Sequence, residues 1–298
     1  MPEPTVQASI AEALGEAVKR LERAGVTNPR REAAALWAAV AGCGMKPGDV
    51  WLRRGEHAEP ELTGRFRRAL ERRAGGSPFA YVVGRVGFRT LELRLDARAL
   101  IPRPETEGLV ELVLRETGKG EGGKGKGGVV ADIGTGCGCI ALALAVEGDF
   151  ERVIAVERSP QAASLARENV ALVRPPVVVE VREGDLLAPL AGARYRAIVS
   201  NPPYLNEVEY AALDPAVREF EPRDALVSGA DGLDATRALL AGAAALLEPG
   251  GLLAVEIDER RAAQVGKLAG ALGWRGVRIH EDLFGRPRFL LAFAKEDA

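Results

Sequence analysis

The chain reads VVADIGTGCG at residues 129–138, an apolar run followed directly by three glycines at alternate positions. The apolar run predicts a buried strand, and segment 140–147 predicts a helix after it. Glycines between a strand and a helix let the backbone approach a ligand closely and present amide N–H groups to it. The spacing is Gly-x-Gly-x-Gly, whereas a dinucleotide-binding loop has Gly-x-Gly-x-x-Gly. Asp132, before the first glycine, suits a bound ammonium or sulfonium and disfavours a phosphate.

Strands and helices alternate from this loop to the end of the chain. The pattern predicts strands at 129–133, 153–156, 177–181, 197–200, 252–257, 276–280 and 289–294, and helices at 140–147, 160–172, 234–247 and 260–272. Such alternation indicates an α/β fold with a mostly parallel seven-stranded sheet and helices on both faces. Ligands bind such sheets beyond the carboxyl ends of the strands, where Gly134, Glu157, Asp185 and Asn201 fall.

The residues before the loop predict a small helical bundle and a strand pair. We expect helices that begin after Thr5 and after Asn28, with Pro29 in the first turn, and a third at 61–73. Leucines alternate with charged residues at 91–96, so a β-hairpin is expected near 78–98. The predicted domains are 1–76, a linker at 77–100, and 101–298. The third helix carries arginines that we interpret as a solvated face, the alternative being contact with RNA or an acidic partner: Arg65, Arg67, Arg68, Arg72 and Arg73.

Composition excludes several classes of function. Forty Lys and Arg against 42 Asp and Glu give a net charge of -2, which disfavours bulk nucleic-acid binding, so no stable nucleic-acid partner is expected. No apolar run long enough to span a membrane and no export signal is apparent, so a cytoplasmic protein is expected. The chain has 3 Cys and 2 His without metal-like spacing, so we expect no metal site. The Gly/Lys-rich segment 118–128 is expected to be a mobile surface loop.

A second motif, IVSNPPY at residues 198–204, ends an apolar strand with a polar residue and two prolines. Prolines cannot continue a strand ladder and lack an N–H, so their carbonyls remain to accept from a ligand. Asn201 offers a planar donor and acceptor, Pro202 a carbonyl, and Tyr204 an aromatic face. Together these groups predict a socket for a planar –NH2 group.

Two acidic residues extend the glycine loop into a cofactor site. Glu157 ends the next strand, where a carboxylate accepts from both ribose hydroxyls, a feature that NAD folds share. Asp185 follows the third strand, where it is expected to accept from an adenine amino group while Leu186 or Leu187 packs on the ring. The glycine loop, Glu157 and Asp185 in this order fit S-adenosyl-L-methionine.

These features together resemble a class I S-adenosylmethionine-dependent methyltransferase that acts on an amide or amino nitrogen. The sequence IPRPETE at 101–107, the segment from Tyr81 to Phe88 and the helical N-terminus make the chain similar to the HemK/PrmC family, the release-factor glutamine N5-methyltransferases. The resemblance implies methylation of the glutamine in the Gly-Gly-Gln motif of bacterial class 1 peptide chain release factors, with S-adenosyl-L-homocysteine as by-product. It also implies that the N-terminal helices help to dock the release factor.

Carried over by position, the resemblance implies roles for individual residues. The methionine part of the cofactor would contact Gly134, Thr135, Gly136, Cys137 and Gly138, the ribose Glu157, and the adenine Asp185 and Leu186. Asn201 would border the cofactor and, with Pro202, Pro203 and Tyr204, bind the substrate amide. The family often has a Gly and a Gln after a Glu-Ile pair in the fifth strand, whereas this chain reads Glu256-Ile257-Asp258-Glu259-Arg260.

Other functions are compatible with the same motifs. The acceptor nitrogen is alternatively a ribosomal-protein glutamine, or an adenine or guanine amine of DNA or rRNA, and a base substrate predicts a flipped-base pocket and a basic track. A module that binds cofactor or RNA without catalysis is another alternative, and the intact amide socket argues against it. The glycine spacing disfavours an NAD-dependent oxidoreductase.

Overall fold

The structure is a computed structural model that describes residues 9–42, 44–118 and 127–296. Thr5, expected to precede the first helix, and most of the Gly/Lys-rich segment 118–128 lie outside the described residues. The chain divides into two compact units, the first comprising Met1–Gly84 and Pro215–Phe220 and the second Arg85–Asp214 and Glu221–Ala298. Each unit is described by itself.

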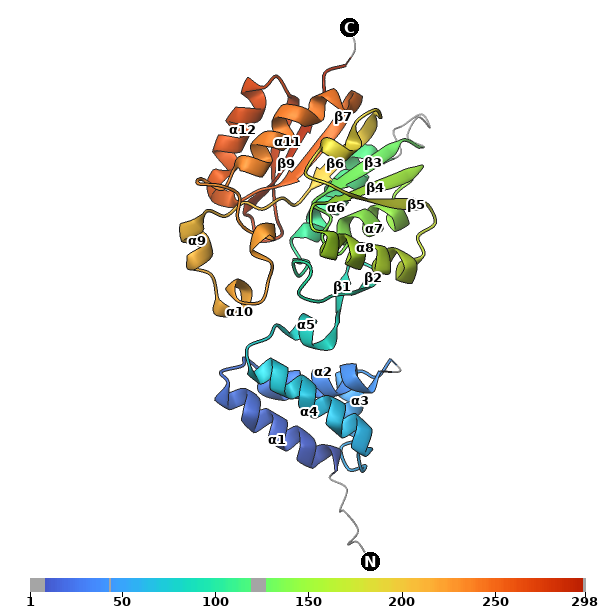
Figure 1. Cartoon of the computed structure of the whole chain (residues 1–298), viewed down its shortest axis with the longest axis vertical. Helices are drawn as coiled ribbons and strands as arrows, with labels where there is room; N and C mark the ends of the chain where they lie inside the picture. The colour runs from blue at the N-terminus through green and yellow to red at the C-terminus, as the bar shows by residue number, and fades with distance from the viewer. Residues whose placement is uncertain (1–8, 43, 119–126, 297–298) are drawn as a thin grey trace, which may run out of the picture. The chain divides into compact units, whose positions relative to one another are not determined.

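The first unit is a helical bundle. Its helices are α1 (Ile10–Arg23), α2 (Pro29–Ala41), α3 (Pro47–Leu52), α4 (Pro60–Ala74), α5 (Phe79–Val83) and α10 (Pro215–Arg218) (Figure 1). Ser9 and Glu12 form a capping box that starts α1. In the core, the rings of Trp37 and Phe66 meet edge-on, with centroids 4.8 Å apart. The three expected helices are present, whereas α3, α5 and α10 were not predicted.

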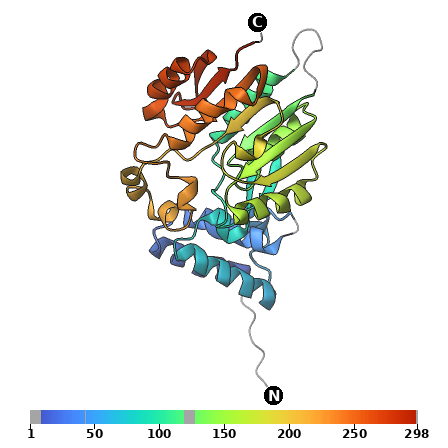
Figure 2. The ribbon, with the colours of Figure 1, turned by 45° about the horizontal axis from the view of Figure 1, so that its top comes forward.

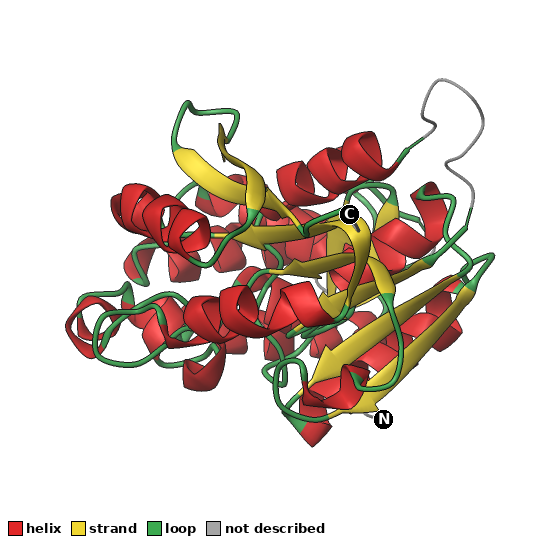
Figure 3. Ribbon diagram, turned by 90° about the horizontal axis from the view of Figure 1, so that it is seen from above, coloured by secondary structure: helices red, strands yellow, loops and turns green. Residues whose placement is uncertain are grey.

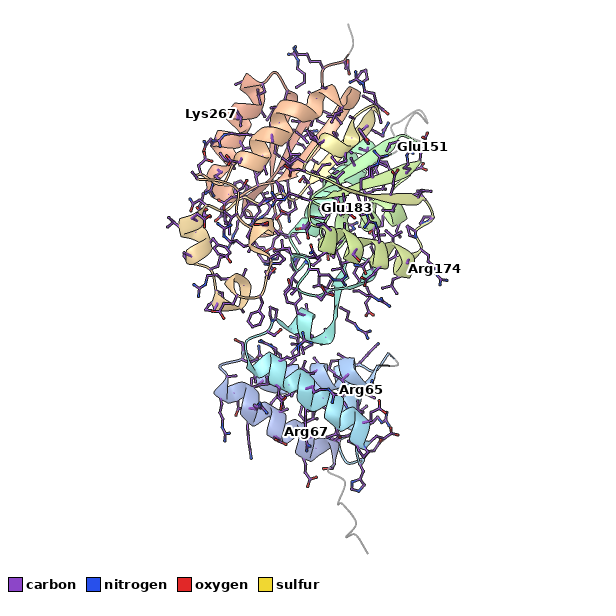
Figure 4. All side chains as sticks on the ribbon, in the orientation of Figure 1. Arg65, Arg67, Glu151, Arg174, Glu183 and Lys267 are labelled. Carbon is purple, nitrogen blue, oxygen red and sulfur yellow. The ribbon has the colours of Figure 1, made fainter. Side chains whose placement is uncertain are left out.

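Two details of the first unit differ from expectation or refine it. Asn28 precedes α2 in a left-handed conformation, and its side chain makes no capping hydrogen bond. Arg65 and Arg67 lie exposed on α4, as a solvated face requires (Figure 4). Arg73 is instead half-buried in an ion pair with Glu32, in which Nε lies 2.7 Å from Oε2. The arginine row is therefore partly structural.

The expected hairpin is shorter than predicted. Strands β1 (Arg85–Phe88) and β2 (Leu91–Arg94) pair antiparallel, but the preceding residues form α5. Tyr81 and Val82 are buried, and Gly84 ends the helical turn with a φ of 75°. Burial against the helical core therefore outweighs the β propensity of this aromatic and β-branched segment.

The second unit is built on one seven-stranded sheet. Its strands are β3 (Val129–Ile133), β4 (Arg152–Glu157), β5 (Val178–Glu183), β6 (Tyr195–Ser200), β7 (Leu247–Glu256), β8 (Arg275–Glu281) and β9 (Pro287–Phe293) (Figure 2). The order across the sheet is β5-β4-β3-β6-β7-β9-β8. The strands from β5 to β7 are parallel, and β9 runs antiparallel to both of its neighbours. The prediction of a mostly parallel seven-stranded sheet is confirmed.

Helices lie on both faces of this sheet (Figure 3). They are α6 (Thr106–Thr117), α7 (Cys139–Glu147), α8 (Pro160–Val173), α11 (Asp234–Gly242) and α12 (Ala262–Ala271). The short helix α9 (Glu207–Ala211) and several 3-10 turns lie in the connections. Alternate strand residues such as Ile133 and Leu253 join Leu239 of α11 and Val265 of α12 in one buried cluster. Gly108 of α6 instead faces Phe289, so α6 covers the opposite face.

The topology gathers strand ends at one edge of the sheet. The carboxyl ends of β3, β4, β5, β6 and β7 lie there because these strands are parallel. The end of β8 lies there too, because β7 and β8 are both antiparallel to β9. Among the described residues, no helix is long and apolar enough to cross a membrane.

Candidate active site

The glycine loop after β3 has the open backbone that a ligand requires. Gly134, Gly136 and Gly138 have φ values of 72°, 56° and 89°, which are strained for any residue with a side chain. A Cβ placed on Gly134 would meet nothing within 4 Å, and one on Gly136 would meet only the Cβ of Ala99 at 3.9 Å. These two glycines are therefore needed for backbone shape, and the space beside them is open.

Asp132 supports this loop from beneath. Its Oδ2 accepts hydrogen bonds from Thr135 Oγ1 at 2.6 Å and from the Ala141 N–H at 3.0 Å. The carboxyl is fully buried, and burial raises the pKa of Asp132 to about 7. Its Oδ1 is also buried and accepts no hydrogen bond within the described part of the chain. The carboxyl is therefore enclosed by the loop, and the expectation that an acid here suits a bound ammonium or sulfonium stays a prediction.

Glu157 joins the glycine loop to the end of β4. Its Oε2 accepts from the Gly136 N–H at 2.9 Å, and its Oε1 accepts from the Ser159 N–H at 2.8 Å. The side chain is half-buried, and each carboxylate oxygen keeps a lone pair for another donor. The structure thus brings Glu157 and the loop together at one edge.

Asp185 and Leu186 lie in the turn after β5, the strand whose last residue, Glu183, is labelled in Figure 4. Asp185 is exposed. Leu186 is half-buried against the main core cluster and has a φ of 45°, a left-handed conformation that costs an L-residue about 1–2 kcal/mol. Backbone strain of this kind is common where a side chain must be aimed at a ligand.

The Asn-Pro-Pro-Tyr motif begins where β6 ends, beside the glycine loop. Ser200 pairs with Ile133 across the two parallel strands, and its Oγ donates to the Ile133 carbonyl at 2.7 Å. Asn201 and Gly134 each follow one member of this pair. The structure therefore brings the two predicted motifs side by side. Pro202 is buried, and Pro203 is half-buried.

A buried network orients the Asn201 side chain. Its Nδ2 donates to Thr106 Oγ1 at 3.1 Å, and the Thr106 hydroxyl donates to Glu256 Oε2 at 2.7 Å. Thr106 and Glu256 are 2% and 1% exposed, and burial raises the pKa of Glu256 to about 7. Because Nδ2 faces Thr106, the planar carboxamide directs Oδ1 away from it. The acceptor of Asn201 therefore lies on the side of the carboxamide away from Thr106.

Thr106 and Glu256 were not predicted as site residues. Both lie in stretches that the sequence singled out, the IPRPETE segment and the Glu-Ile pair at the end of β7. The sequence offered one local signal for Thr106 as a site residue, which is that it follows two prolines and begins a helix. The partner of its hydroxyl is 150 positions away in the chain.

Glu221 tethers the same IPRPETE segment. Its Oε1 lies 2.7 Å from Arg103 Nη2, and its Oε2 accepts from the Ile101 N–H at 3.1 Å. Glu221 is 5% exposed, so its carboxylate is shielded from water, whereas the Arg103 side chain is half-buried. This segment is therefore bound both to the chain that follows the Asn-Pro-Pro-Tyr motif and, through Thr106, to Asn201 itself.

Asn169 of α8 is a further residue that the sequence did not indicate. Its Oδ1 accepts from the Arg94 N–H at 2.7 Å, and its Nδ2 donates to the Arg94 and Cys137 carbonyls at 3.0 and 2.8 Å. The side chain is fully buried. It links β2 to the glycine loop and fixes the carbonyl of Cys137.

Tyr204 and Cys137 complete the predicted set. Tyr204 is half-buried, and burial raises the pKa of its phenol to about 12. Cys137 and Cys139 are buried free thiols that contribute packing. Across the described ranges, no group of three or more His, Cys, Asp or Glu side chains is placed to hold a metal ion.

Comparison with known proteins identifies the family. Residues 12–84 match the PrmC N-terminal domain, and residues 114–219 match the methyltransferase small domain. The release factor glutamine methyltransferase of Moorella thermoacetica is 42% identical over 292 residues, which cover 97% of this chain and 100% of that protein. The enzyme of that name from Deinococcus radiodurans is 42% identical over 279 residues, covering 94% of this chain and 96% of its own.

Solved structures support the same fold. A methyltransferase from Pyrococcus furiosus superposes with a TM-score of 0.52 at 22% sequence identity, covering 70% of this chain and 90% of that chain. The fold is that of the class I S-adenosylmethionine-dependent methyltransferases. Together with the near full-length relatives, this confirms the resemblance seen in the sequence: the chain belongs to the release factor glutamine methyltransferase family.

Proposed function

We propose that the protein methylates the side-chain amide nitrogen of the glutamine in the Gly-Gly-Gln motif of class 1 peptide chain release factors. The names of the relatives at 42% identity support this substrate. The observation that carries the proposal is the Asn201 carboxamide, which donates through Nδ2 to Thr106 and directly follows Ser200, the partner of Ile133 before the glycine loop. Its Oδ1 would then be the atom that accepts from the substrate.

The residues around the loop fit S-adenosylmethionine. The loop 134–138, including Thr135 and Cys137, would hold the methionine part, because Gly134 and Gly136 leave open space where a Cβ would stand. Glu157 would accept from the ribose hydroxyls, and Asp185 with Leu186 would bind the adenine. When bound, this cofactor supplies a methyl group on a sulfonium and leaves as S-adenosylhomocysteine.

The substrate amide requires activation because its nitrogen lone pair is delocalised into the carbonyl. Asn201 Oδ1 and the Pro202 carbonyl would accept hydrogen bonds from its two N–H groups. Pro203 would shape the turn, and Tyr204 would pack against the amide plane. Positive charge grows on the nitrogen as its new bond to carbon forms, and these oxygens stabilise that charge until a proton is lost. Fixed acceptors also align the nitrogen for attack.

The domain roles follow from the same assignment. We infer that residues 1–76 dock the release factor, that 77–100 form a linker and that 101–298 carry out catalysis. The match of 12–84 to the PrmC N-terminal domain supports a dedicated role for the helical part. The enzyme would act in the cytoplasm on a protein partner, without a stable nucleic-acid partner, because the net charge of -2 offers no general attraction for phosphates.

A labelled-methyl assay tests this function. Wild type is expected to label a release factor but not the same factor with its Gly-Gly-Gln glutamine replaced. Label that persists after the replacement would overturn the substrate assignment. Asn201→Ala is expected to lose most transfer while its calorimetric affinity for S-adenosylmethionine survives, and loss of cofactor binding would count against the assigned role. Asn206→Ser is the control, since serine also caps α9, whose first turn Asn206 now caps.

A further inference from the structure

The turn between β8 and β9, residues 282–286, projects from the same sheet edge as Asn201. This placement follows from topology, because β8 runs parallel to β6 and β7 and ends where they end. At the base of the hairpin, the Arg288 carbonyl accepts a hydrogen bond from the Ile257 N–H at 2.8 Å. Ile257 is the neighbour of Glu256, so the hairpin is continuous with the network that orients Asn201.

The tip of this hairpin exposes two large apolar side chains. Leu283 is 101% exposed and Phe284 is 74% exposed. Leu283 contributes no burial to the fold and Phe284 contributes little, so packing within the fold does not account for their apolar character. Two adjacent bare apolar residues at a ligand-binding edge are typical of a contact surface for another molecule.

The tip is held in one conformation. Asp282 Oδ1 accepts from the Phe284 and Arg286 N–H groups at 2.8 and 3.1 Å, and Asp282 Oδ2 accepts from Arg288 Nε at 3.1 Å. The Asp282 N–H also donates to the Arg286 carbonyl at 2.9 Å. A structured tip loses little conformational entropy when a partner covers it.

Ion pairs connect the tip to a second exposed apolar residue near the motif. Arg286 Nε lies 3.8 Å from Glu259 Oε2. Arg260, the residue after Glu259, has its Nη1 3.0 Å from Oε1 of Glu209 in α9. Val208, next to Glu209, is 79% exposed. Apolar groups therefore border the edge on both sides of the turn that follows β7.

We propose that Leu283 and Phe284 bind an apolar patch on the release factor, beside the loop that carries the glutamine. This rests on the proposed function. The reacting side chain is one glutamine preceded by two glycines, which offer no side chains for recognition, so much of the affinity must come from surface outside the motif. The body of a protein substrate faces this edge whenever its glutamine reaches Asn201, and among the described residues Leu283 and Phe284 form the pair of adjacent, largely exposed apolar side chains there.

Steady-state kinetics of Leu283→Ser/Phe284→Ser test the proposal. The KM for the release factor is expected to rise about 30-fold, as two exposed apolar side chains lose their contacts, with kcat unchanged at saturation. A short peptide that contains Gly-Gly-Gln should be methylated equally by wild type and variant. Leu272→Ser is the control, because Leu272 is also exposed, at 48%, but precedes β8 at the opposite edge of the sheet.

Further measurements distinguish docking from a folding defect and from self-association. Equal thermal unfolding and equal cofactor affinity in the double variant would exclude a folding defect. An unchanged KM for the release factor, or a wild-type dimer that the double variant dissociates in light scattering, would overturn the docking role. A wild type that never labels a release factor would refute the proposed function, whereas an active wild type with an equally efficient double variant refutes the docking role alone.

Discussion

Replacing Thr106 with valine removes one hydroxyl from the centre of the site and keeps the shape of the side chain. The change deletes the 3.1 Å bond from Asn201 and the 2.7 Å bond to Glu256. Leaving a buried polar group without a partner costs about 1–3 kcal/mol. With two groups affected, we expect the free energy of unfolding of Thr106→Val to fall by roughly 2–4 kcal/mol.

The effect on catalysis is expected to be separable from the effect on stability. Without Thr106 Oγ1, nothing distinguishes the two ends of the Asn201 carboxamide, so Nδ2 competes with Oδ1 for the position that faces the substrate amide. Loss of one fixed polar group at a reacting centre commonly costs about 100-fold in kcat. We expect a fall of about 10- to 100-fold in kcat, with little change in the KM for the release factor.

Three variants measured together decide the matter. Thr106→Ser keeps the hydroxyl and is expected to restore most of kcat. Thr117→Val is the control, because Thr117 is a buried threonine at the other end of α6 whose hydroxyl donates to the Val113 carbonyl, away from Asn201. Urea unfolding monitors stability, and labelled-methyl transfer at saturating cofactor monitors kcat. A Thr106→Val enzyme with kcat within about twofold of wild type would refute the orienting role.

Two further predictions concern titrating groups. Burial raises the pKa of Glu256 from 4.5 to about 7, so the folded state holds this proton more tightly, and the resulting stability is lost as pH rises through about 7. Between about pH 5 and 8, the free energy of unfolding in urea should fall by roughly 2–3 kcal/mol more for wild type than for Glu256→Gln. Parallel plots of this free energy against pH would contradict the prediction. Burial raises the pKa of Tyr204 to about 12, so its phenol stays protonated. Tyr204→Phe should therefore match the wild-type kcat–pH profile from about pH 7 to 10, whereas Tyr204→Ala should be impaired.

Much of the sheet was predictable because its central strands are buried on both faces. A parallel strand covered by helices reads as a continuous apolar run, and the predicted bounds of β3 match the structure. Helix ends were less predictable. The segment expected as one helix at 234–247 is α11 followed by a 3-10 turn, and β7 already begins at Leu247. Ala-rich sequence is compatible with either kind of turn, so packing against the sheet decides.

Some residues of the site were predictable from local sequence and others were not. Asn201, Glu157 and the glycine loop were identifiable because each follows a strand, and parallel strands bring their ends to one edge. Thr106, Glu256 and Asn169 were not, because their roles depend on hydrogen bonds to residues far away in the chain. Asn201 and Thr106 are 95 positions apart, and Asn169 and Cys137 are 32 apart. Local pattern carries no information about such pairings.

The two hydrogen bonds between Asn169 and the backbone of Arg94 make the Arg94 amide a reporter of ligand binding at the glycine loop. One carboxamide holds both the N–H of Arg94 in β2 and the carbonyl of Cys137 beside the cofactor loop. A ligand that reduces the motion of the glycine loop therefore also slows the local opening that exposes the Arg94 N–H to solvent. Deuterium uptake at the Arg94 amide should then fall when the cofactor site is occupied, although Arg94 is not one of the residues assigned to that site.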